Sequence, residues 1–383
     1  RQLREQWQYN NIMYVLAGHL LATVSGAPWE ETVHRDIVAP LGMTATSFSV
    51  TEMQRAPEFA LPYRERADTL ALMNFRNIDN VGPAGSINSN IEDMLKWVRV
   101  HLGGGQVDGR RFIEGATLRD MHTPHMVIPG IPSEGELSPL SYGLGWMIQT
   151  YRGHYRVQHG GNIDGFSALV TLFPRDDLAV VVLTNRNGTA LPGLLTDHAV
   201  DRVLELPRRE WLAEAHARLV AARTQGAAAV ERLAEERVRN TRPAFPLAAY
   251  AGEYAHPGYG TLRMALDGQR LVMTYNGIVT PLEHWHYEVF SGLEAPQDPT
   301  FHRAKLHFAS DLRGRVASVS VAMEPAVPPI VFERQPDPQL SDPSFLQRFV
   351  GPYYMAAGGM LQIGLQGRRL VLEIPGQPPY TLE

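Results

Sequence analysis

An internal repeat with a constant spacing of 99 residues restricts the fold of the final part of this 383-residue chain. Residues 247–277 match residues 346–376 without a gap, and Tyr250-Ala251-Gly252-Glu253-Tyr254 corresponds to Phe349-Val350-Gly351-Pro352-Tyr353. In both copies short apolar runs alternate with Gly and Asn turns, which is typical of antiparallel strands. The repeat therefore predicts either two similar β modules or two halves of one barrel.

The preceding residues combine helical and strand patterns. Apolar residues at helical spacing predict helices over 11–24, 28–38, 89–102, 193–206 and 209–238. The third of these begins at Ser89-Asn90-Ile91-Glu92, which has the form of a capping box. Short apolar or alternating runs predict strands over 142–151, 154–158, 167–173 and 178–184.

Helices followed by antiparallel strands and closing helices predict an α+β domain over residues 1–240. Pro243 and Pro246 mark the predicted boundary, and the β-rich region then spans residues 247–383. A chain of this length is too long for one ordinary core, which agrees with two domains.

Composition excludes several classes of site. The chain has no cysteine, so disulfides, thiol catalysis and thiolate metal sites are excluded. Its net charge of −5 gives no reason to expect a nucleic-acid partner. No apolar run approaches the ~20 residues of a membrane-spanning helix, so no membrane span is expected. His284 and His286 have no third ligand near them in the sequence, and we expect no metal and no cofactor.

Tyr9-Asn10-Asn11 stands at the start of the first predicted helix. A tyrosine beside a cation would favour its phenolate, which can relay a proton to and from a serine hydroxyl. An asparagine two residues later can hydrogen-bond a substrate carbonyl or a catalytic ammonium group. Taken alone, the tripeptide fits a half-buried tyrosine beside a helix-capping asparagine better.

His159-Gly160-Gly161-Asn162 lies between two predicted strands. Paired glycines let a substrate approach a strand edge because no Cβ obstructs it, and a backbone N–H there can form half of an oxyanion hole. An ordinary surface histidine beside a glycine bulge explains the motif equally well.

Four blocks of sequence between residues 5 and 206 occur in the order of one known family. The blocks are Tyr9-Asn10-Asn11, the segment from Tyr14 to Pro40-Leu41-Gly42-Met43, Gly85-Ser86-Ile87-Asn88-Ser89, and Tyr142-Gly143-Leu144-Gly145-Trp146 with His159-Gly160-Gly161. Together they resemble the serine hydrolases of the class C β-lactamase, esterase and D-amino-acid peptidase family, in the variant with His in place of Lys in the third motif. The region after 247 is similar to the lipocalin-like domain appended to some of these hydrolases.

In this family a Ser-x-x-Lys at a helix start supplies the nucleophile and the lysine that activates it. The chain has two lysines, and Asp93 and His302 stand three residues before Lys96 and Lys305. The chain also opens on Arg1 without Met, so we expect the nucleophile in natural sequence upstream. By itself the 383-residue chain is predicted to be inactive.

The resemblance implies a role for each site residue that the chain contains. The upstream serine would attack a carbonyl while its proton passes to a Lys–Tyr9 pair, and Asn11 would contact the substrate or that lysine. His159 would line the opposite side of the pocket and hydrogen-bond the substrate or Tyr9. Gly160-Gly161-Asn162 would lie against the substrate, with the N–H of Asn162 sharing the oxyanion with the serine N–H. Water would then release the acyl-enzyme.

The prediction is a serine-β-lactamase-like α+β domain followed by an all-β lipocalin-like barrel, in a hydrolase of ester or amide bonds that acts on a small molecule or peptide. Histidine in the third motif weakens the case for binding a β-lactam carboxylate and favours an esterase or peptidase. Two alternatives stay open: a non-catalytic protein that binds peptides or peptidoglycan fragments, and a penicillin-recognising D,D-carboxypeptidase or β-lactamase. The resemblance favours a periplasmic or secreted protein, but the sequence itself decides neither compartment nor oligomeric state.

Overall fold

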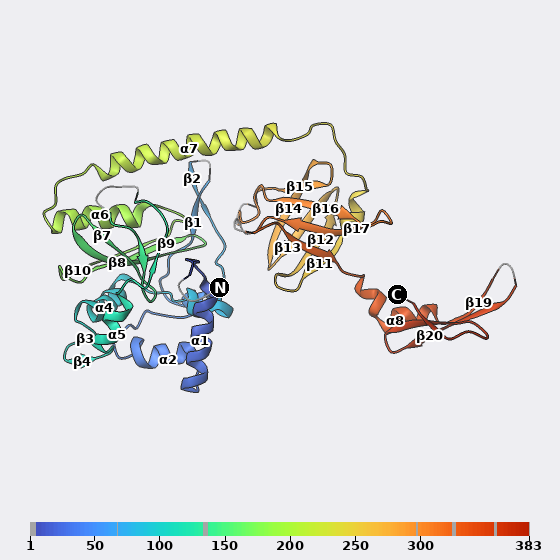
Figure 1. Ribbon diagram of the computed structural model, residues 1–383, viewed down its shortest axis with the longest axis horizontal. Helices are drawn as coiled ribbons and strands as arrows, with labels where there is room; N and C mark the ends of the chain where they lie inside the picture. The colour runs from blue at the N-terminus through green and yellow to red at the C-terminus, as the bar shows by residue number, and fades with distance from the viewer. Residues whose placement is uncertain are drawn as a thin grey trace. The chain divides into compact units, whose positions relative to one another are not determined.

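A computed structural model describes residues 5–66, 68–132, 137–295, 298–323, 327–355 and 358–382. The chain divides into two compact units, residues 1–226 (unit 1) and 227–383 (unit 2). The division falls within the long helix α7 (Trp211–Glu235), shown in Figure 1. The boundary placed at residues 240–246 from the sequence stays a prediction.

Within the described residues, unit 1 is built on an antiparallel sheet of six strands in the order β10-β9-β8-β7-β6-β5. The strands are β5 (Met126–Val127), β6 (Ser141–Tyr142), β7 (Met147–Tyr151), β8 (His154–Ile163), β9 (Phe166–Phe173) and β10 (Leu178–Thr184). One expectation is wrong: His159 to Asn162 do not lie between two strands, because β8 continues through them while paired with β9.

Helices cover both faces of this sheet. On one face Leu172 packs with Val98 of α4, and on the other Phe173 packs with Val200 of α6 and Trp211 of α7. The helical segments of unit 1 before α7 are α1 (Asn11–Ser25), α2 (Trp29–Val33), the π-helix η1 (His34–Val38), α3 (Val50–Met53), the 3-10 helix η2 (Asp79–Ala84), α4 (Ile91–Leu102), α5 (Gly115–Met121) and α6 (Leu191–Val203). Two small hairpins complete the unit: β1 (Tyr63–Arg66) with β2 (Thr69–Leu72), and β3 (Gln106–Val107) with β4 (Arg110–Arg111). The α+β prediction for this part of the chain is confirmed.

The start of α4 differs from the predicted capping box. Its N-cap is Asn90, whose side chain accepts a hydrogen bond from the N–H of Asp93 at 2.9 Å. The hydroxyl of Ser89 is 2.8 Å from that of Thr46 instead. The helix therefore begins one residue later than a cap at Ser89 would require.

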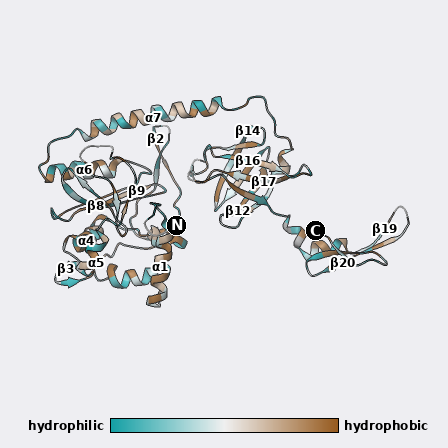
Figure 2. Ribbon diagram, in the orientation of Figure 1, coloured by the Kyte–Doolittle hydropathy of each residue, from teal (hydrophilic) through white to brown (hydrophobic). Residues whose placement is uncertain are grey.

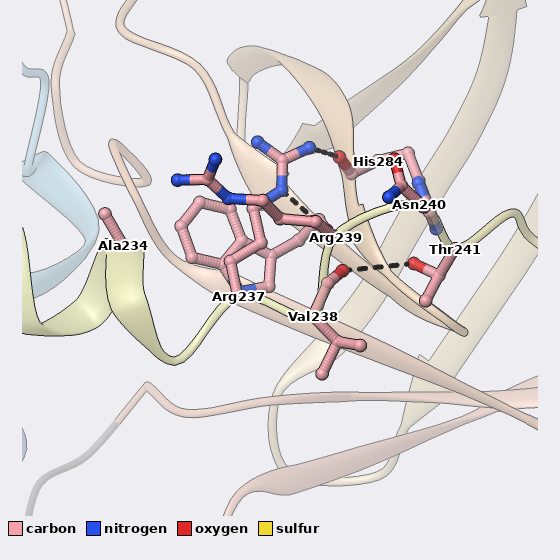
Figure 3. Close-up of a pocket in the computed structure, with 8 residues that line it drawn as sticks. Ala234, Arg237, Val238, Arg239, Asn240, Thr241 and His284 are labelled. Carbon is pink, nitrogen blue, oxygen red and sulfur yellow. Dashed lines mark hydrogen bonds between the residues drawn. The ribbon is translucent and has the colours of Figure 1, made fainter.

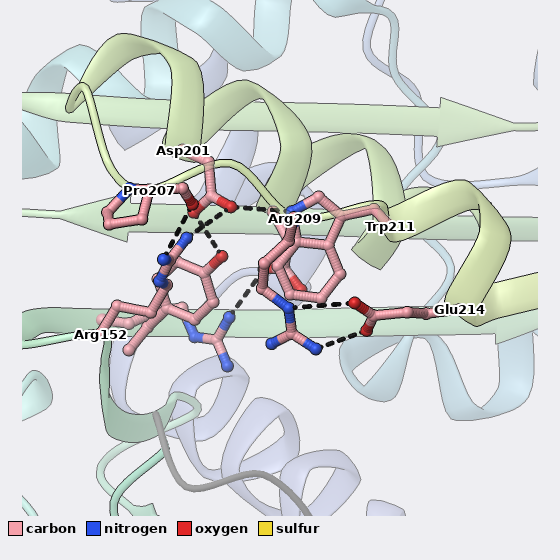
Figure 4. A network of polar contacts seen from close by, with 9 residues as sticks. Arg152, Asp201, Pro207, Arg209, Trp211 and Glu214 are labelled. Carbon is pink, nitrogen blue, oxygen red and sulfur yellow. Dashed lines mark hydrogen bonds and ion pairs between the residues drawn. The ribbon is translucent and has the colours of Figure 1, made fainter.

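A buried carboxylate joins α6 and α7 to the sheet (Figure 4). Asp201 accepts hydrogen bonds from the hydroxyl of Tyr151 at 2.7 Å and the indole N–H of Trp211 at 2.8 Å, and it pairs with Arg152 at 2.7 Å. The guanidinium of Arg209 lies over the Trp211 ring at 4.1 Å. Since a buried charge is tolerated only when paired and hydrogen-bonded, these partners fix where α7 leaves the sheet.

Two buried histidines meet between α4 and the end of α5. Nδ1 of His101 is 3.1 Å from Nε2 of His122, and both rings contact Trp146. Burial lowers the pKa of His101 to about 3, with a further contribution from His122, and lowers that of His122 to about 4. Both imidazoles are therefore neutral at neutral pH, which allows one ring to donate to the other.

Unit 2 contains a closed antiparallel barrel whose described strands number eight (Figure 1). The strands are β11 (Gly252–His256), β12 (Gly260–Asp267), β13 (Arg270–Tyr275), β14 (Ile278–His286), β15 (Val289–Gly292), β16 (Lys305–Ser310), β17 (Val316–Val321) and β18 (Ile330–Arg334). The short 3-10 helix η3 (Leu247–Tyr250) precedes them. Tyr250 packs its ring against Phe290 and Phe308 in the fully buried core. The all-β barrel predicted for this region is confirmed.

The second copy of the repeat forms a separate sheet. After η4 (Pro338–Ser341), α8 (Pro343–Leu346) and η5 (Gln347–Phe349) come β19 (Gly351–Tyr354), β20 (Met360–Gln366), β21 (Arg369–Glu373) and β22 (Tyr380–Thr381). Its first two hairpins keep the register of the barrel with every partner shifted by 99: Tyr254↔Leu262 in the barrel becomes Tyr353↔Leu361. Burial is not kept, because Tyr254 is 0% exposed and Tyr353 is 42% exposed.

Arg237 fastens the segment after α7 to the barrel (Figure 3). Its guanidinium donates to the carbonyls of Trp285 and His284, both at 2.8 Å, and lies 4.9 Å from the centre of the Trp285 ring. The ammonium of Lys305 lies over the same ring at 3.4 Å. Trp285 therefore contacts two cations, which orders this side of the barrel.

Helix α1 carries an exposed apolar stripe, formed by residues four apart: Ile12, Leu16, Leu20 and Val24. Val24 is 79% exposed, and Figure 2 colours much of this helix as hydrophobic. Among the described residues no single helix is long and apolar enough to cross a membrane, and α1 meets that test only jointly with the segment 29–38, from which it is bent by 77°.

The repeat offers a matched pair of substitutions. We expect Leu262→Ala to destabilise the barrel by about 2–5 kcal/mol, because this side chain is fully buried. Leu361→Ala, at the equivalent position of the second copy, is expected to cost about 1 kcal/mol or less. Urea unfolding followed by hydrogen-exchange mass spectrometry measures the stability of the barrel and of the second sheet separately, through the peptides of each. Equal costs would mean that the second sheet has a core as well buried as the first.

The histidine pair predicts a pH dependence of stability. The pKa values of His101 and His122 are lower in the folded chain than the ordinary 6.5, so the unfolded chain binds more protons below that pH. Stability is then complete above about pH 6.5 and is lost as pH falls toward the folded values. Urea titrations at about pH 7 and about pH 5 give the loss of unfolding free energy between the two pH values. We expect this loss to be about 2 kcal/mol smaller in His101→Phe than in the wild type. His198→Gln, at an exposed position of α6, is the control for losing an imidazole. An unchanged slope in His101→Phe would contradict the assignment.

Candidate functional site

The candidate site is built on the free edge of β8. β7 pairs with β8 as far as Met147↔Gln158, whereas β9 continues to pair with it up to Ile163↔Phe166. In the part of the chain that the structure describes, residues 159–163 therefore have a strand partner on one side only. Such an edge offers main-chain N–H and C=O groups to an extended ligand.

The register of the β8–β9 hairpin decides which groups face the open edge. Asp164-Gly165 form a two-residue turn flanked by Ile163 and Phe166. Hydrogen-bonded and non-bonded pairs alternate along an antiparallel ladder, and the pair flanking a two-residue turn is a hydrogen-bonded one. The N–H and C=O groups of Asn162 and Gly160 therefore point away from β9, toward the open edge.

The two glycines provide clearance along this edge. Both are exposed, and neither has a positive φ. A Cβ on Gly161 would have no heavy atom outside its immediate neighbours within 4 Å, while one on Gly160 would lie 3.3 Å from the carbonyl oxygen of Ala168. A methyl group at 161 would thus occupy open space along the edge.

His159, at the beginning of the free segment, uses both ring nitrogens. Nδ1 lies 2.7 Å from the carbonyl oxygen of Gly160, and Nε2 lies 3.1 Å from the hydroxyl of Tyr142. The ring thus bonds Tyr142, and the expectation that His159 hydrogen-bonds the substrate or Tyr9 stays a prediction. The rings of Tyr9 and His159 are nevertheless neighbours, with centroids 6.2 Å apart.

Tyr9 belongs to a group of four aromatic side chains that also contains Trp7, Tyr142 and His159. Trp7 lies 5.0 Å from the ring centre of Tyr142, and Tyr9 meets the same ring edge-on at 6.3 Å. Tyr9 is 49% exposed, so one side of this group faces solvent. The structure therefore brings Tyr9 together with the His159 edge from positions 150 residues apart.

Tyr9 is a neutral phenol in this chain. Burial, followed by the influence of Tyr14, raises the pKa of Tyr9 above its ordinary value. The expected phenolate needs a cation, and both lysines are engaged elsewhere. Lys96 pairs with Asp93 at 2.9 Å, and Lys305 lies over Trp285 in the barrel.

The asparagines at the start of α1 have different tasks. Asn10 is the N-cap, since its side-chain oxygen accepts from the N–H of Ile12 at 2.8 Å. Asn11 is the first helical residue and its side chain is exposed. Because Asn10 performs the capping, Asn11 is available to a ligand above the helix start.

The side chain of Asn162 is committed to the protein. Its oxygen accepts from the N–H of Gly188 at 2.6 Å and from the hydroxyl of Ser167 at 2.7 Å, and its amide donates to Asn187 at 3.1 Å. These bonds hold the loop after β10 against the end of β8. The main-chain N–H is the group that this residue offers to the open edge.

Sequence reasoning gave no site role to Trp7 and Tyr142. Tyr142 stood in the block that ends at Trp146, and only the sheet order β8-β7-β6 brings it to His159. Trp7 had a weak signal, an aromatic residue two positions before Tyr9. The described residues contain no group of three or more His, Asp or Glu that could hold a metal ion.

Comparison with known proteins identifies the family of the first half of the chain. Residues 1–205 match the Beta-lactamase family. The chain belongs to this family of β-lactamase-related serine hydrolases. Residues 236–334 match a second family, described as a domain of unknown function (DUF3471).

Two curated relatives illustrate the similarity. Unguisins hydrolase ungD of Aspergillus violaceofuscus is 30% identical over 286 residues, which are 69% of this chain and 50% of that protein. Protein flp of Staphylococcus aureus is 24% identical over 193 residues, 50% of this chain and 36% of that protein. The chain thus spans half or less of these relatives. Among solved structures, the octameric penicillin-binding protein homologue from Pyrococcus abyssi is 18% identical with a TM-score of 0.49, over 87% of this chain and 66% of that one.

Two neighbouring substitutions test the construction of the edge. Asn162→Ala removes three hydrogen bonds and is expected to lower the free energy of unfolding by about 1 kcal/mol, since the site is exposed to water. Gly161→Ala is expected to change it by about 0.5 kcal/mol or less. Urea unfolding measures both. A large loss in Gly161→Ala would show that the space beside the edge is filled by the protein.

Proposed function

We propose that the natural protein is a serine hydrolase of ester or amide bonds that works through an acyl-enzyme, with its nucleophile in an upstream Ser-x-x-Lys. The observation that carries the proposal is the meeting of Tyr9 with the His159 edge. A helix start with a proton-relaying tyrosine and a free strand edge are the two fixed sides that a serine nucleophile between them requires.

Each site residue has a role in this proposal. The serine proton passes to the lysine paired with Tyr9, and the ammonium of that lysine lowers the pKa of the tyrosine that burial now raises. Asn11 contacts the substrate or the lysine. The acyl group lies along the glycines, and the oxyanion forms between the serine N–H and the N–H of Asn162.

The exposed stripe of α1 supports an additional packed segment. Ile12, Leu16, Leu20 and Val24 present one continuous apolar face, and such faces mark interaction sites. A helix that bears Ser-x-x-Lys at its start and packs on this stripe parallel to α1 would bring its serine to the same end as Tyr9. Covering the stripe would also bury apolar area and stabilise unit 1.

An ester or a peptide-like amide is the proposed substrate class. Histidine in the third motif provides no fixed cation for the carboxylate of a β-lactam. The relative named as a hydrolase of unguisins supports hydrolysis of this general kind for the shared region.

A binding protein for peptides or peptidoglycan fragments is the second candidate. For the 383 residues considered alone the engagement of both lysines elsewhere favours it, because a phenol without a neighbouring ammonium is a hydrogen-bond donor and not a base. This chain alone is accordingly proposed to be inactive.

The test uses the natural protein with its upstream sequence, assayed on p-nitrophenyl butyrate, a D-alanyl-D-alanine peptide and nitrocefin. We expect ester or peptide hydrolysis, with kcat lowered about 10²–10⁴-fold in Tyr9→Phe because the proton relay is lost. Gly161→Ala is expected to raise KM, since its methyl group occupies the space of the substrate.

Tyr155→Phe is the matched control, because its hydroxyl donates to the carbonyl of His122 and lies outside the site. Binding of the peptide without turnover would favour the second candidate. Faster turnover of nitrocefin than of the ester would instead identify a β-lactamase. Hydrolysis by the 383-residue chain that Tyr9→Phe abolishes would contradict the need for an upstream nucleophile.

A further inference from the structure

The hydrogen bonds of His159 determine where its proton lies. The carbonyl oxygen of Gly160 can only accept, so Nδ1, at 2.7 Å, must carry a hydrogen. In a neutral imidazole Nε2 then has a lone pair and no hydrogen. At 3.1 Å from the hydroxyl of Tyr142, Nε2 is therefore the acceptor and Tyr142 is the donor.

Tyr142 is suited to donate this hydrogen bond. Burial raises the pKa of Tyr142 far above its ordinary value. The phenol is consequently protonated throughout the pH range of hydrolysis. Its ring is held by Trp7 at 5.0 Å and by Tyr9 at 6.3 Å, so the hydroxyl is directed by packing.

We propose that Tyr142 is a positioning residue that holds His159 as the Nδ1–H tautomer. Through that tautomer it also holds the carbonyl of Gly160, which the β8–β9 register aims into the open edge. Two successive hydrogen bonds thus connect β6 to the free segment of β8. They do so just beyond Met147↔Gln158, the last pair between β7 and β8.

Two functional consequences follow, and they rest on the proposed function. His159 has no free lone pair, so it acts in the pocket as a fixed wall and not as the general base. Occupation of the Gly160 carbonyl also keeps this acceptor on the His159 ring, while the N–H of Asn162 faces the open edge where an oxyanion would be received. Loss of the Tyr142 hydroxyl frees Nε2, so the ring of His159 and the carbonyl of Gly160 are both held less firmly.

The tautomer is measurable in the 383-residue chain without any turnover. Protein labelled with ¹⁵N-histidine gives two-bond ¹H–¹⁵N correlations that distinguish Nδ1–H from Nε2–H imidazole, and His159→Gln identifies the signal. We expect Nδ1–H in the wild type and a shift toward Nε2–H, the form preferred in water, in Tyr142→Phe. The phenylalanine ring keeps the contacts with Trp7 and Tyr9.

Tyr155→Phe is the matched control, since it removes another tyrosine hydroxyl bond of the same domain and is expected to leave the His159 tautomer unchanged. An Nε2–H signal for His159 in the wild type would overturn the proposal. So would an Nδ1–H signal that persists in Tyr142→Phe, because another group would then hold the ring.

A second measurement uses the natural protein with its upstream sequence. Tyr142→Phe is expected to lower kcat/KM for the ester substrate about tenfold, the size of one lost hydrogen bond in a fixed site. An unchanged kcat/KM would overturn the positioning role even if the tautomer shifts. If the wild type hydrolyses nothing, the proposed function fails while the tautomer assignment stands on the NMR result alone.

Discussion

The pairing of β8 with β9 beyond the end of β7 is the interaction on which the candidate site depends. β8 is ten residues long and β7 is five, so among the residues that the structure describes the second half of β8 has a partner on one side only. The difference in length opens the edge, and the two-residue turn at Asp164-Gly165 sets the register that aims its main-chain groups. Asn162 then ties this edge to the loop after β10 through its side chain.

On its open side the free segment of β8 has no described strand to hold it, and the aromatic group around Tyr142 supplies part of that support. A strand would fix the free segment by main-chain bonds, whereas Tyr142 reaches it through the ring of His159. The rings of Trp7 and Tyr9 lie beside those of Tyr142 and His159, respectively. Within residues 159–162 of β8, the two glycines leave space beside the strand, and the side chains of His159 and Asn162 fix its two ends.

Local patterns predicted much of this fold, and contacts between distant residues account for what they missed. The helix after Asn10 and the strand ending at Phe173 follow from capping and periodicity, and both were predicted closely. Gly160 and Gly161 suggested a break because glycine is weak in strands, but pairing with β9 overrides that preference. The bond between Tyr142 and His159 depends on sheet order, which no local pattern contains.

The two copies of the repeat also separate what local sequence determines from what distant contacts determine. The registers of their first two hairpins agree because register depends on the turns and the alternation of side chains. Their burial differs because Tyr254 is enclosed by the remaining strands of a closed barrel and Tyr353 is not. Similar sequence therefore specifies the hairpins, while closure supplies the core.

The contacts of Arg237 affect where the barrel domain begins along the chain. The family match for this region begins at residue 236, so it includes Arg237 together with the Trp285 that it covers. A cut among the prolines at 243–246 would separate the two and leave the carbonyls of His284 and Trp285 without the guanidinium that donates to them, while Lys305 would stay over the indole. Arg237, outside the barrel strands, is thus as much a part of this domain as the strands themselves.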